Sequence, residues 1–144
     1  MGFLTGKTVI ITGAGRAVLK DGSCGSIGYG IATAYAKEGA NLVITGRNVK
    51  KLEAAKQELE SLYGIKVLTV QADVCTGGDN EATVANVVKQ AVDAFGGIQV
   101  LINNAQASAS GVPLAEHTTE QFDLAIYSGL YAAFYYMKAC YPYL

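Results

Sequence analysis

The sequence has no tryptophan, two prolines and a single histidine in 144 residues. Its three cysteines, Cys24, Cys75 and Cys140, are widely spaced and form no Cys-x-x-Cys pair. With one histidine and no paired cysteines, an ordinary zinc site is not expected, and no metal is assigned. An odd number of distant cysteines also argues against a disulfide scaffold. It favours a reducing compartment, so we expect a cytoplasmic location.

A strong charge of either sign is also missing. Eleven basic residues nearly balance twelve acidic ones, which leaves none of the basic surface that nucleic acid or an anionic membrane requires. The stretch 124–144 carries one charged side chain, Lys138, and is long enough to span a bilayer. Its six tyrosines and Pro142 favour a buried or interface helix instead. Neither nucleic acid nor a membrane is expected as a partner.

The residues that are abundant indicate one folded domain over 1–144. Hydrophobic residues make up 51% and charged residues 16% of the chain, which excludes a disordered protein. The 17 glycines, with so few prolines, suit tight turns between regular elements.

Short β-branched runs alternate with stretches of helical periodicity. The predicted strands are Thr8–Thr12, Asn41–Thr45, Lys66–Val70 and Ile98–Ile102. The predicted helices cover 27–38, 48–63 and 79–95, and a long last helix opens at a Thr118–Gln121 capping box. In the second helix the expected buried face is Leu52, Ala55, Leu59 and Leu62. This βαβαβαβα order predicts an α/β fold, a Rossmann-like doubly wound parallel sheet in three αβα layers.

In such a sheet, ligands bind beyond the carboxyl ends of the strands. The first strand ends in the glycine-rich turn Thr12–Gly15, and Ser26–Gly28 follows where a helix begins. Such a turn presents backbone N–H groups to a phosphate. A long insertion interrupts the Gly-x-Gly-x-x-Gly fingerprint, so a plain flexible turn remains the alternative.

The other strand ends carry polar side chains. Arg47 stands where an NAD site has a carboxylate, and a guanidinium suits a 2′-phosphate; a solvated surface arginine is the alternative. Asp73 is placed either to accept from an adenine amino group or to cap its own loop. Asn103 and Asn104 offer donors and acceptors after the fourth strand, where a simple turn is the alternative.

Taken together, these places are similar to the short-chain dehydrogenase/reductase family over the whole chain. The matching segments are Thr12-Gly13, Ser26-Ile27-Gly28, Ile31-Ala32, Glu38-Gly39-Ala40, Gly46-Arg47-Asn48, Asp73-Val74 and Asn103-Asn104-Ala105. The resemblance implies an NAD(P)-dependent oxidoreductase that passes a hydride between nicotinamide and a small alcohol or carbonyl substrate.

The same resemblance implies a role for each matching residue. The pyrophosphate and nearby ribose would be held by Thr12, Gly13, Ser26, Ile27 and Gly28. The adenine would be flanked by Asp73 and Val74. The nicotinamide-side ribose would be bordered by Asn104 and Ala105, and the sheet would be steadied by Asn103. Arg47 favours NADP(H) over NAD(H).

The chain also departs from the family pattern. Ser26 replaces a usual glycine, and Arg16 or Lys20 in the long loop before it is expected near the phosphates. Gln106 replaces another usual glycine, and Gly129 stands where many members carry an active-site asparagine.

The family's chemistry needs a serine and a tyrosine followed four residues later by a lysine, and no lysine of this sequence lies four residues after a tyrosine. No catalytic residue is therefore assigned. We expect a truncated, amino-terminal half that is inactive alone, with a non-catalytic nucleotide-binding or scaffold protein as the alternative. A homo-oligomer is expected through the aromatic face of the last helix. That face comprises Tyr127, Tyr131, Phe134, Tyr135 and Tyr136.

Overall fold

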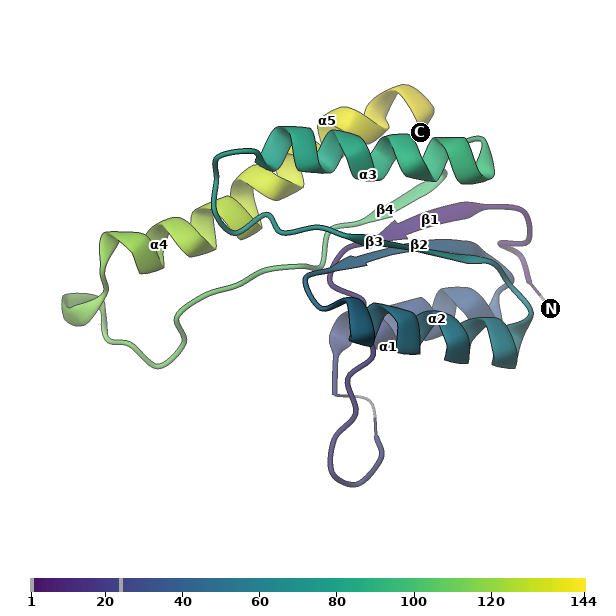
Figure 1. The fold of residues 1–144 in the computed structure, drawn as a ribbon, viewed down its shortest axis with the longest axis horizontal. Helices are drawn as coiled ribbons and strands as arrows, with labels where there is room; N and C mark the ends of the chain where they lie inside the picture. The colour runs from purple at the N-terminus through teal and green to yellow at the C-terminus, as the bar shows by residue number, and fades with distance from the viewer. Residues whose placement is uncertain (1, 24) are drawn as a thin grey trace.

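The computed structural model describes residues 2–23 and 25–144, so Cys24 lies outside the described residues. Four parallel strands form one sheet in the order β3-β2-β1-β4 (Figure 1). They are β1 (Thr8–Ile11), β2 (Asn41–Gly46), β3 (Val67–Gln71) and β4 (Val100–Ile102). Helices α1 (Ile27–Lys37) and α2 (Val49–Tyr63) cover one face, and α3 (Asn80–Phe95) and α5 (Ala132–Cys140) cover the other. The predicted three-layer, doubly wound fold is confirmed.

The core is divided by the sheet into two apolar layers, because successive strand residues point to opposite faces. On β1, Val9 and Ile11 pack toward α1 and α2, whereas Ile10 packs toward α3 and α5. All three side chains are fully buried. Continuous β-branched runs are what a sheet covered on both faces requires.

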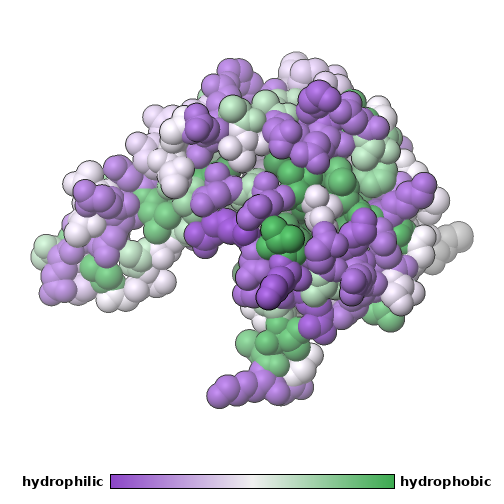
Figure 2. Space-filling view, viewed as in Figure 1, coloured by the Kyte–Doolittle hydropathy of each residue, from purple (hydrophilic) through white to green (hydrophobic). Residues whose placement is uncertain are grey.

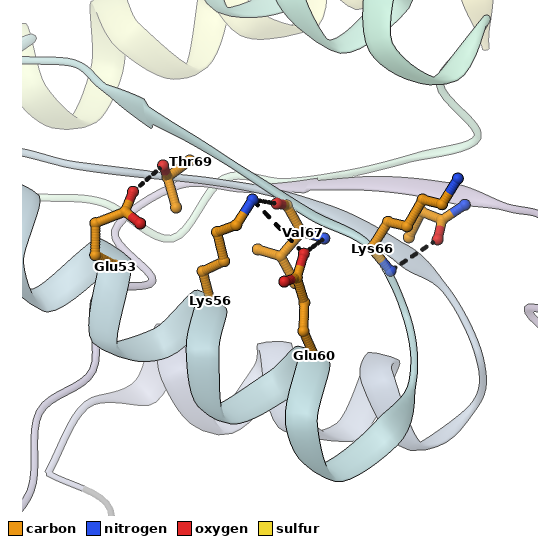
Figure 3. A network of polar contacts seen from close by, with 7 residues as sticks. Glu53, Lys56, Glu60, Lys66, Val67 and Thr69 are labelled. Atoms are coloured by element: carbon orange, nitrogen blue, oxygen red, sulfur yellow. Dashed lines mark hydrogen bonds and ion pairs between the residues drawn. The ribbon is translucent and has the colours of Figure 1, made fainter.

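Helix α2 is fixed to the edge strand β3 by polar contacts (Figure 3). Lys56 Nζ donates to the Val67 carbonyl at 2.8 Å, and Glu60 Oε1 accepts from the Val67 N–H at 3.0 Å. Thr69 Oγ1 donates to Glu53 at 2.7 Å. The two bonds to Val67 satisfy backbone groups at an edge of the sheet that would otherwise be open to pairing.

The helix boundaries follow the predicted capping residues. Asn48 accepts from the Lys51 N–H at 3.1 Å at the start of α2, and Gly64 ends it with φ 66°. One prediction was wrong: Leu62 is 63% exposed. It lies at the margin of the buried face and lines a shallow surface groove with Glu58 and Ser61.

The last helix is one helical run of mixed type. Helix α4 (Thr119–Ala125) begins at the predicted capping box of Thr118 and Gln121. A π-helical segment, Ile126–Tyr131, then joins it to α5. The sequence pattern predicted a single long helix and did not reveal this wider turn. No helix among the described residues has both the length and the hydropathy to cross a membrane.

Candidate functional site

A cleft of about 360 Å³ lies at the carboxyl ends of the strands. Figure 2 shows the molecule hollowed on the side where α4 extends from the body. The walls of this cleft come from the loops after all four strands and from the last helix. They comprise Thr12, Gly13, Thr45, Gly46, Arg47, Ala72, Val74, Cys75, Asn103, Asn104, Ala105, Gln106, Ala107, Ser128, Gly129, Ala132, Ala133 and Tyr136. The topology thus brings most of the predicted residues to one place.

The floor of the cleft is held by Thr12 and Asn104. Thr12 Oγ1 accepts from the N–H groups of Asn104 and Ala105, both at 2.9 Å. Asn104 Nδ2 donates to the carbonyls of Thr12 and Gly13, at 3.0 and 3.2 Å. Asn104 therefore joins the β1 and β4 loops, a role that we had predicted for Asn103. The prediction was wrong because the inward-facing asparagine is the second of the pair, whereas Asn103 is exposed in the cleft wall.

Two glycines allow the turn after β1 to pack tightly. Gly13 has φ 69°, and a Cβ built on it would lie 3.0 Å from Ala105 Cα. A Cβ on Gly28 would lie 2.1 Å from the Gly13 carbonyl oxygen. Gly28 thus supports the glycine-rich turn from beneath and does not line the cleft, whereas Gly13 does.

The start of α1 faces the same end of the molecule. Ser26 caps this helix, because its side chain accepts from the Tyr29 N–H at 3.2 Å. Ile27, the first helical residue, has a side chain that is 78% exposed. The N-terminus of α1 therefore lies beside the second cleft described below, which Ser26 lines, and a helix N-terminus favours an anion.

A second cleft of about 590 Å³ adjoins the first and shares Gly13, Gly46 and Arg47 with it. Ser26, Asn48 and Lys51 complete its polar lining. Two cationic side chains thus line this space at the N-terminus of α2, and no carboxylate is among its lining residues. Cations at a helix N-terminus, where the backbone N–H groups are also positive, favour an anion.

The long loop after β1 does not bring its basic residues to this space. Within this loop the Leu19 N–H donates to the Ser23 carbonyl at 2.8 Å, which closes a short hairpin over 19–23, and this part of the loop projects from the body (Figure 1). Lys20 lies at the turn of this hairpin. Arg16 instead pairs with Glu58, with Nε 2.6 Å from Oε2. Neither Arg16 nor Lys20 is among the residues that line the two clefts.

Glu58 also accepts a hydrogen bond from the Tyr29 hydroxyl. This bond and the adjacent Arg16 guanidinium lower the pKa of Glu58 below its usual value. Burial, followed by the Glu58 contact, raises the pKa of Tyr29 to about 12. The three side chains connect the β1 loop, α1 and α2.

The loop after β3 is fixed by its own residues. Asp73 Oδ1 accepts from the Cys75 N–H at 2.9 Å, which is the local-cap alternative for this carboxylate. Buried Asn80 donates to the Val74 carbonyl at 2.7 Å. Val74 and Cys75 then line the cleft. Burial is the main cause of the raised pKa of the Cys75 thiol.

Apart from Gly129, which the family resemblance implied to be near the active site, sequence reasoning missed the contribution of the last helix to the cleft. Ser128, Gly129, Ala132, Ala133 and Tyr136 line it. Tyr136, which was predicted on the uncovered aromatic face of the last helix, is instead buried, and this burial raises its pKa to about 12. The available signal was a run of small residues at helical spacing inside an otherwise aromatic helix. Across residues 2–23 and 25–144, no three His, Cys, Asp or Glu side chains gather as metal ligands.

Comparisons with known proteins agree with this geometry. The family model for short chain dehydrogenases matches residues 7–144. A 12alpha-hydroxysteroid dehydrogenase from Clostridium sp. is 60% identical over 144 residues, which are all of this chain and 53% of that protein.

Two solved structures are similar as well. L-sorbose reductase from Gluconobacter frateurii, complexed with NADPH and L-sorbose, aligns with a TM-score of 0.82 and 30% identity over 96% of this chain and 48% of its own. An alcohol dehydrogenase from Thermococcus sibiricus, complexed with 5-hydroxy-NADP, aligns with a TM-score of 0.82 and 29% identity over 96% of this chain and 53% of its own. The chain thus spans about half the length of these relatives. On this match to the family model and this fold, the chain belongs to the short-chain dehydrogenase family.

Proposed function

We propose that residues 1–144 form the coenzyme-binding part of an NADP(H)-dependent oxidoreductase that acts on a small alcohol or carbonyl compound. The observation that carries this proposal is the pair of adjoining clefts at the carboxyl ends of the strands, with a cationic end at Arg47 and an amide-lined end at Asn104. When bound, the coenzyme supplies or accepts a hydride at its nicotinamide ring.

The diphosphate is assigned to the glycine-rich turn and the start of α1. Gly13 and Ser26 line the clefts, and the backbone N–H groups of Ser26, Ile27 and Gly28 lie at the positive end of α1. Thr12 holds the Asn104 and Ala105 backbone that forms the opposite wall. A turn that no Cβ obstructs is what close approach of a diphosphate requires.

The 2′-phosphate is assigned to Arg47 and Lys51. Both line the same space, and Gly46 at the end of β2 carries no carboxylate to accept from a ribose 2′-hydroxyl. A guanidinium and an ammonium beside a helix N-terminus favour a phosphate monoester over a neutral hydroxyl. NADP(H) is therefore proposed in preference to NAD(H).

The remaining predicted residues are assigned to the two ends of the coenzyme. Val74 lines the cleft beyond β3 with Asp73 beside it, which suits the adenine. Asn103, Asn104 and Ala105 lie beyond β4, which suits the nicotinamide-side ribose. With adenosine at the β2–β3 side, we assign the reactive ring to the opposite side of the sheet, near β4; the strand order β3-β2-β1-β4 supports this assignment.

The proton-transfer groups are assigned to the part of the relatives that this chain does not span, because these 144 residues contain no tyrosine four residues before a lysine. The 60% identity to a 12alpha-hydroxysteroid dehydrogenase makes a hydroxysteroid the first substrate class to test.

The test is a binding titration of NADPH and NADH against the protein expressed from its complete reading frame. Arg47→Asp should weaken NADPH binding about tenfold to a hundredfold, since bonds to charged groups contribute about 1.5–3 kcal/mol. It should leave NADH binding unchanged or improved. Lys51→Ala should also weaken NADPH binding without weakening NADH binding. Lys50→Ala is the control: it removes a charge outside the cleft and should leave the affinity for both coenzymes unchanged. Equal affinities for both coenzymes, unaltered by Arg47→Asp, would remove the NADP(H) assignment.

A further inference from the structure

The β4 end of the cleft contains a side chain without an assigned role, Gln106. It lines the cleft and is exposed there. A Cβ built on Gly129 would lie 3.6 Å from Gln106 Cγ. The loop after β4 and the last helix therefore meet where position 129 has no side chain, and the Gln106 side chain occupies the adjacent space.

Ser128 fixes this arrangement from the helix side. Its Oγ accepts from the Ala107 N–H at 2.9 Å and lies 2.7 Å from the Leu124 carbonyl and 3.1 Å from the Ala107 carbonyl, within donating distance of both. Ser128 is buried in the π-helical segment. Ala107 is thus hydrogen-bonded to Ser128. This contact holds the carboxamide of Gln106 opposite Gly129.

Two of the neighbouring polar side chains, Thr12 and Asn104, are already engaged within the protein. The Thr12 hydroxyl accepts from the N–H groups of Asn104 and Ala105, and the Asn104 side-chain amide donates to the carbonyls of Thr12 and Gly13. Among the described residues, Gln106 Nε2 donates to the carbonyl of its neighbour in sequence, Ala107, at 3.0 Å. A ligand can replace so local a bond at little cost. Gln106 is therefore available to a ligand, and of the two exposed amides that line this end of the cleft, Asn103 and Gln106, it is the one beside Gly129.

We propose that Gln106 is a substrate-binding residue whose carboxamide hydrogen-bonds the reacting oxygen of the alcohol or carbonyl substrate, in the space beside Gly129. This inference rests on the proposed function. A carboxamide carries both a donor and an acceptor, so it can bind the carbonyl through Nε2 and the alcohol through Oε1. The Gln106 carboxamide belongs to the loop after β4, whereas Arg47 follows β2 at the other end of the cleft. The proposed function assigns the reactive ring to this β4 side.

The first test measures substrate and coenzyme separately in the protein expressed from its complete reading frame. Gln106→Ala should raise KM for the substrate about threefold to tenfold, the contribution of one net hydrogen bond, with the NADPH Kd unchanged. Ser108→Ala, which alters an exposed polar side chain of the same loop, is the matched control and should change neither. A changed NADPH Kd with an unchanged KM would overturn the assignment, as would no change in either.

The second test addresses the space at Gly129. Gly129→Ala should be tolerated, because its Cβ would make ordinary contact with Gln106, whereas Gly129→Leu should displace the carboxamide and raise KM as Gln106→Ala does. The double variant Gln106→Ala/Gly129→Leu should be no worse than either single one. Additive effects, in variants whose circular dichroism and NADPH Kd match the parent, would contradict the pairing. Failure of the parent protein to bind NADPH would instead refute the proposed function.

Discussion

At the residue scale, Gly28 matters for packing more than for contact with a ligand. A methyl group there would meet the Gly13 carbonyl and Asn104 Nδ2, at 2.1 and 2.6 Å. The Asn104 amide also bonds the Gly13 carbonyl. The first helix and the β1 and β4 loops therefore share one contact point, and a shift at Gly28 has to displace them all.

We predict that Gly28→Ala lowers the free energy of unfolding by about 1–3 kcal/mol, the usual range for overpacking, and weakens NADPH binding. Chemical denaturation and a coenzyme titration measure the two effects. Gly78→Ala is the control, since nothing lies within 4 Å of its added Cβ. If Gly28→Ala were as stable as Gly78→Ala, the packing role would be refuted.

At the element scale, Glu58 joins α2 to α1 through Tyr29 and to the β1 loop through Arg16. The Tyr29 hydrogen bond and the Arg16 charge hold the pKa of Glu58 below its usual value. A carboxyl with a lowered folded-state pKa adds stability above its unfolded pKa. That contribution is lost as the pH falls through the lowered value.

Glu58→Gln should therefore cost about 1 kcal/mol or less at neutral pH, because the pair is partly exposed, and the difference from the parent should vanish in acid. Urea unfolding from pH 7 down to pH 3 measures it. Glu116→Gln, in an exposed turn, is the control and should not alter the pH profile in this way. A Glu58→Gln deficit that persists unchanged in acid would show that the ionised carboxylate is not responsible.

The last helix shows what an element-level pattern can conceal. Its capping box and apolar spacing predicted a helix from Thr118, and the structure confirms one. Within the π-helical segment, the Ser128 hydroxyl hydrogen-bonds Ala107 and Leu124. Because Ala107 belongs to a loop 21 residues earlier, no local pattern indicates this bond.

At the scale of the whole molecule, the last helix leaves a large apolar surface uncovered. Leu130, Phe134 and Met137 are each more than half exposed, and tilted ring pairs connect Tyr127, Tyr131, Tyr135 and Phe134. Contiguous apolar patches of this kind mark contacts with another chain or aggregation. We propose that this surface forms a homo-oligomer contact.

The 144-residue chain should accordingly self-associate, and Phe134→Glu should reduce that association by placing a charge in the contact. Size-exclusion chromatography with light scattering measures both. Ser61→Glu, on an exposed part of α2 instead of the last helix, is the control. A monodisperse monomer of these 144 residues that melts cooperatively would contradict the prediction.

The sequence by itself determined the order of the elements and the end of the sheet at which ligands bind. Those depend on local periodicity, capping residues and glycines: β-branched runs between helices leave only a doubly wound sheet, and Asn48 and Gly64 mark the limits of α2. The residues that follow the four strands, and so lie at the ligand-binding end of the sheet, are therefore predictable from the sequence.

Only the tertiary structure decided which side chains make the contacts between distant parts of the chain. It assigned the bond between strands to Asn104 instead of Asn103, turned Arg16 to Glu58, exposed Leu62 and brought Ser128 and Gly129 against the β4 loop. The physical reason is that these outcomes depend on partners far away in the chain. Local periodicity carries information about neighbours within a few residues, and not about contacts across the sheet.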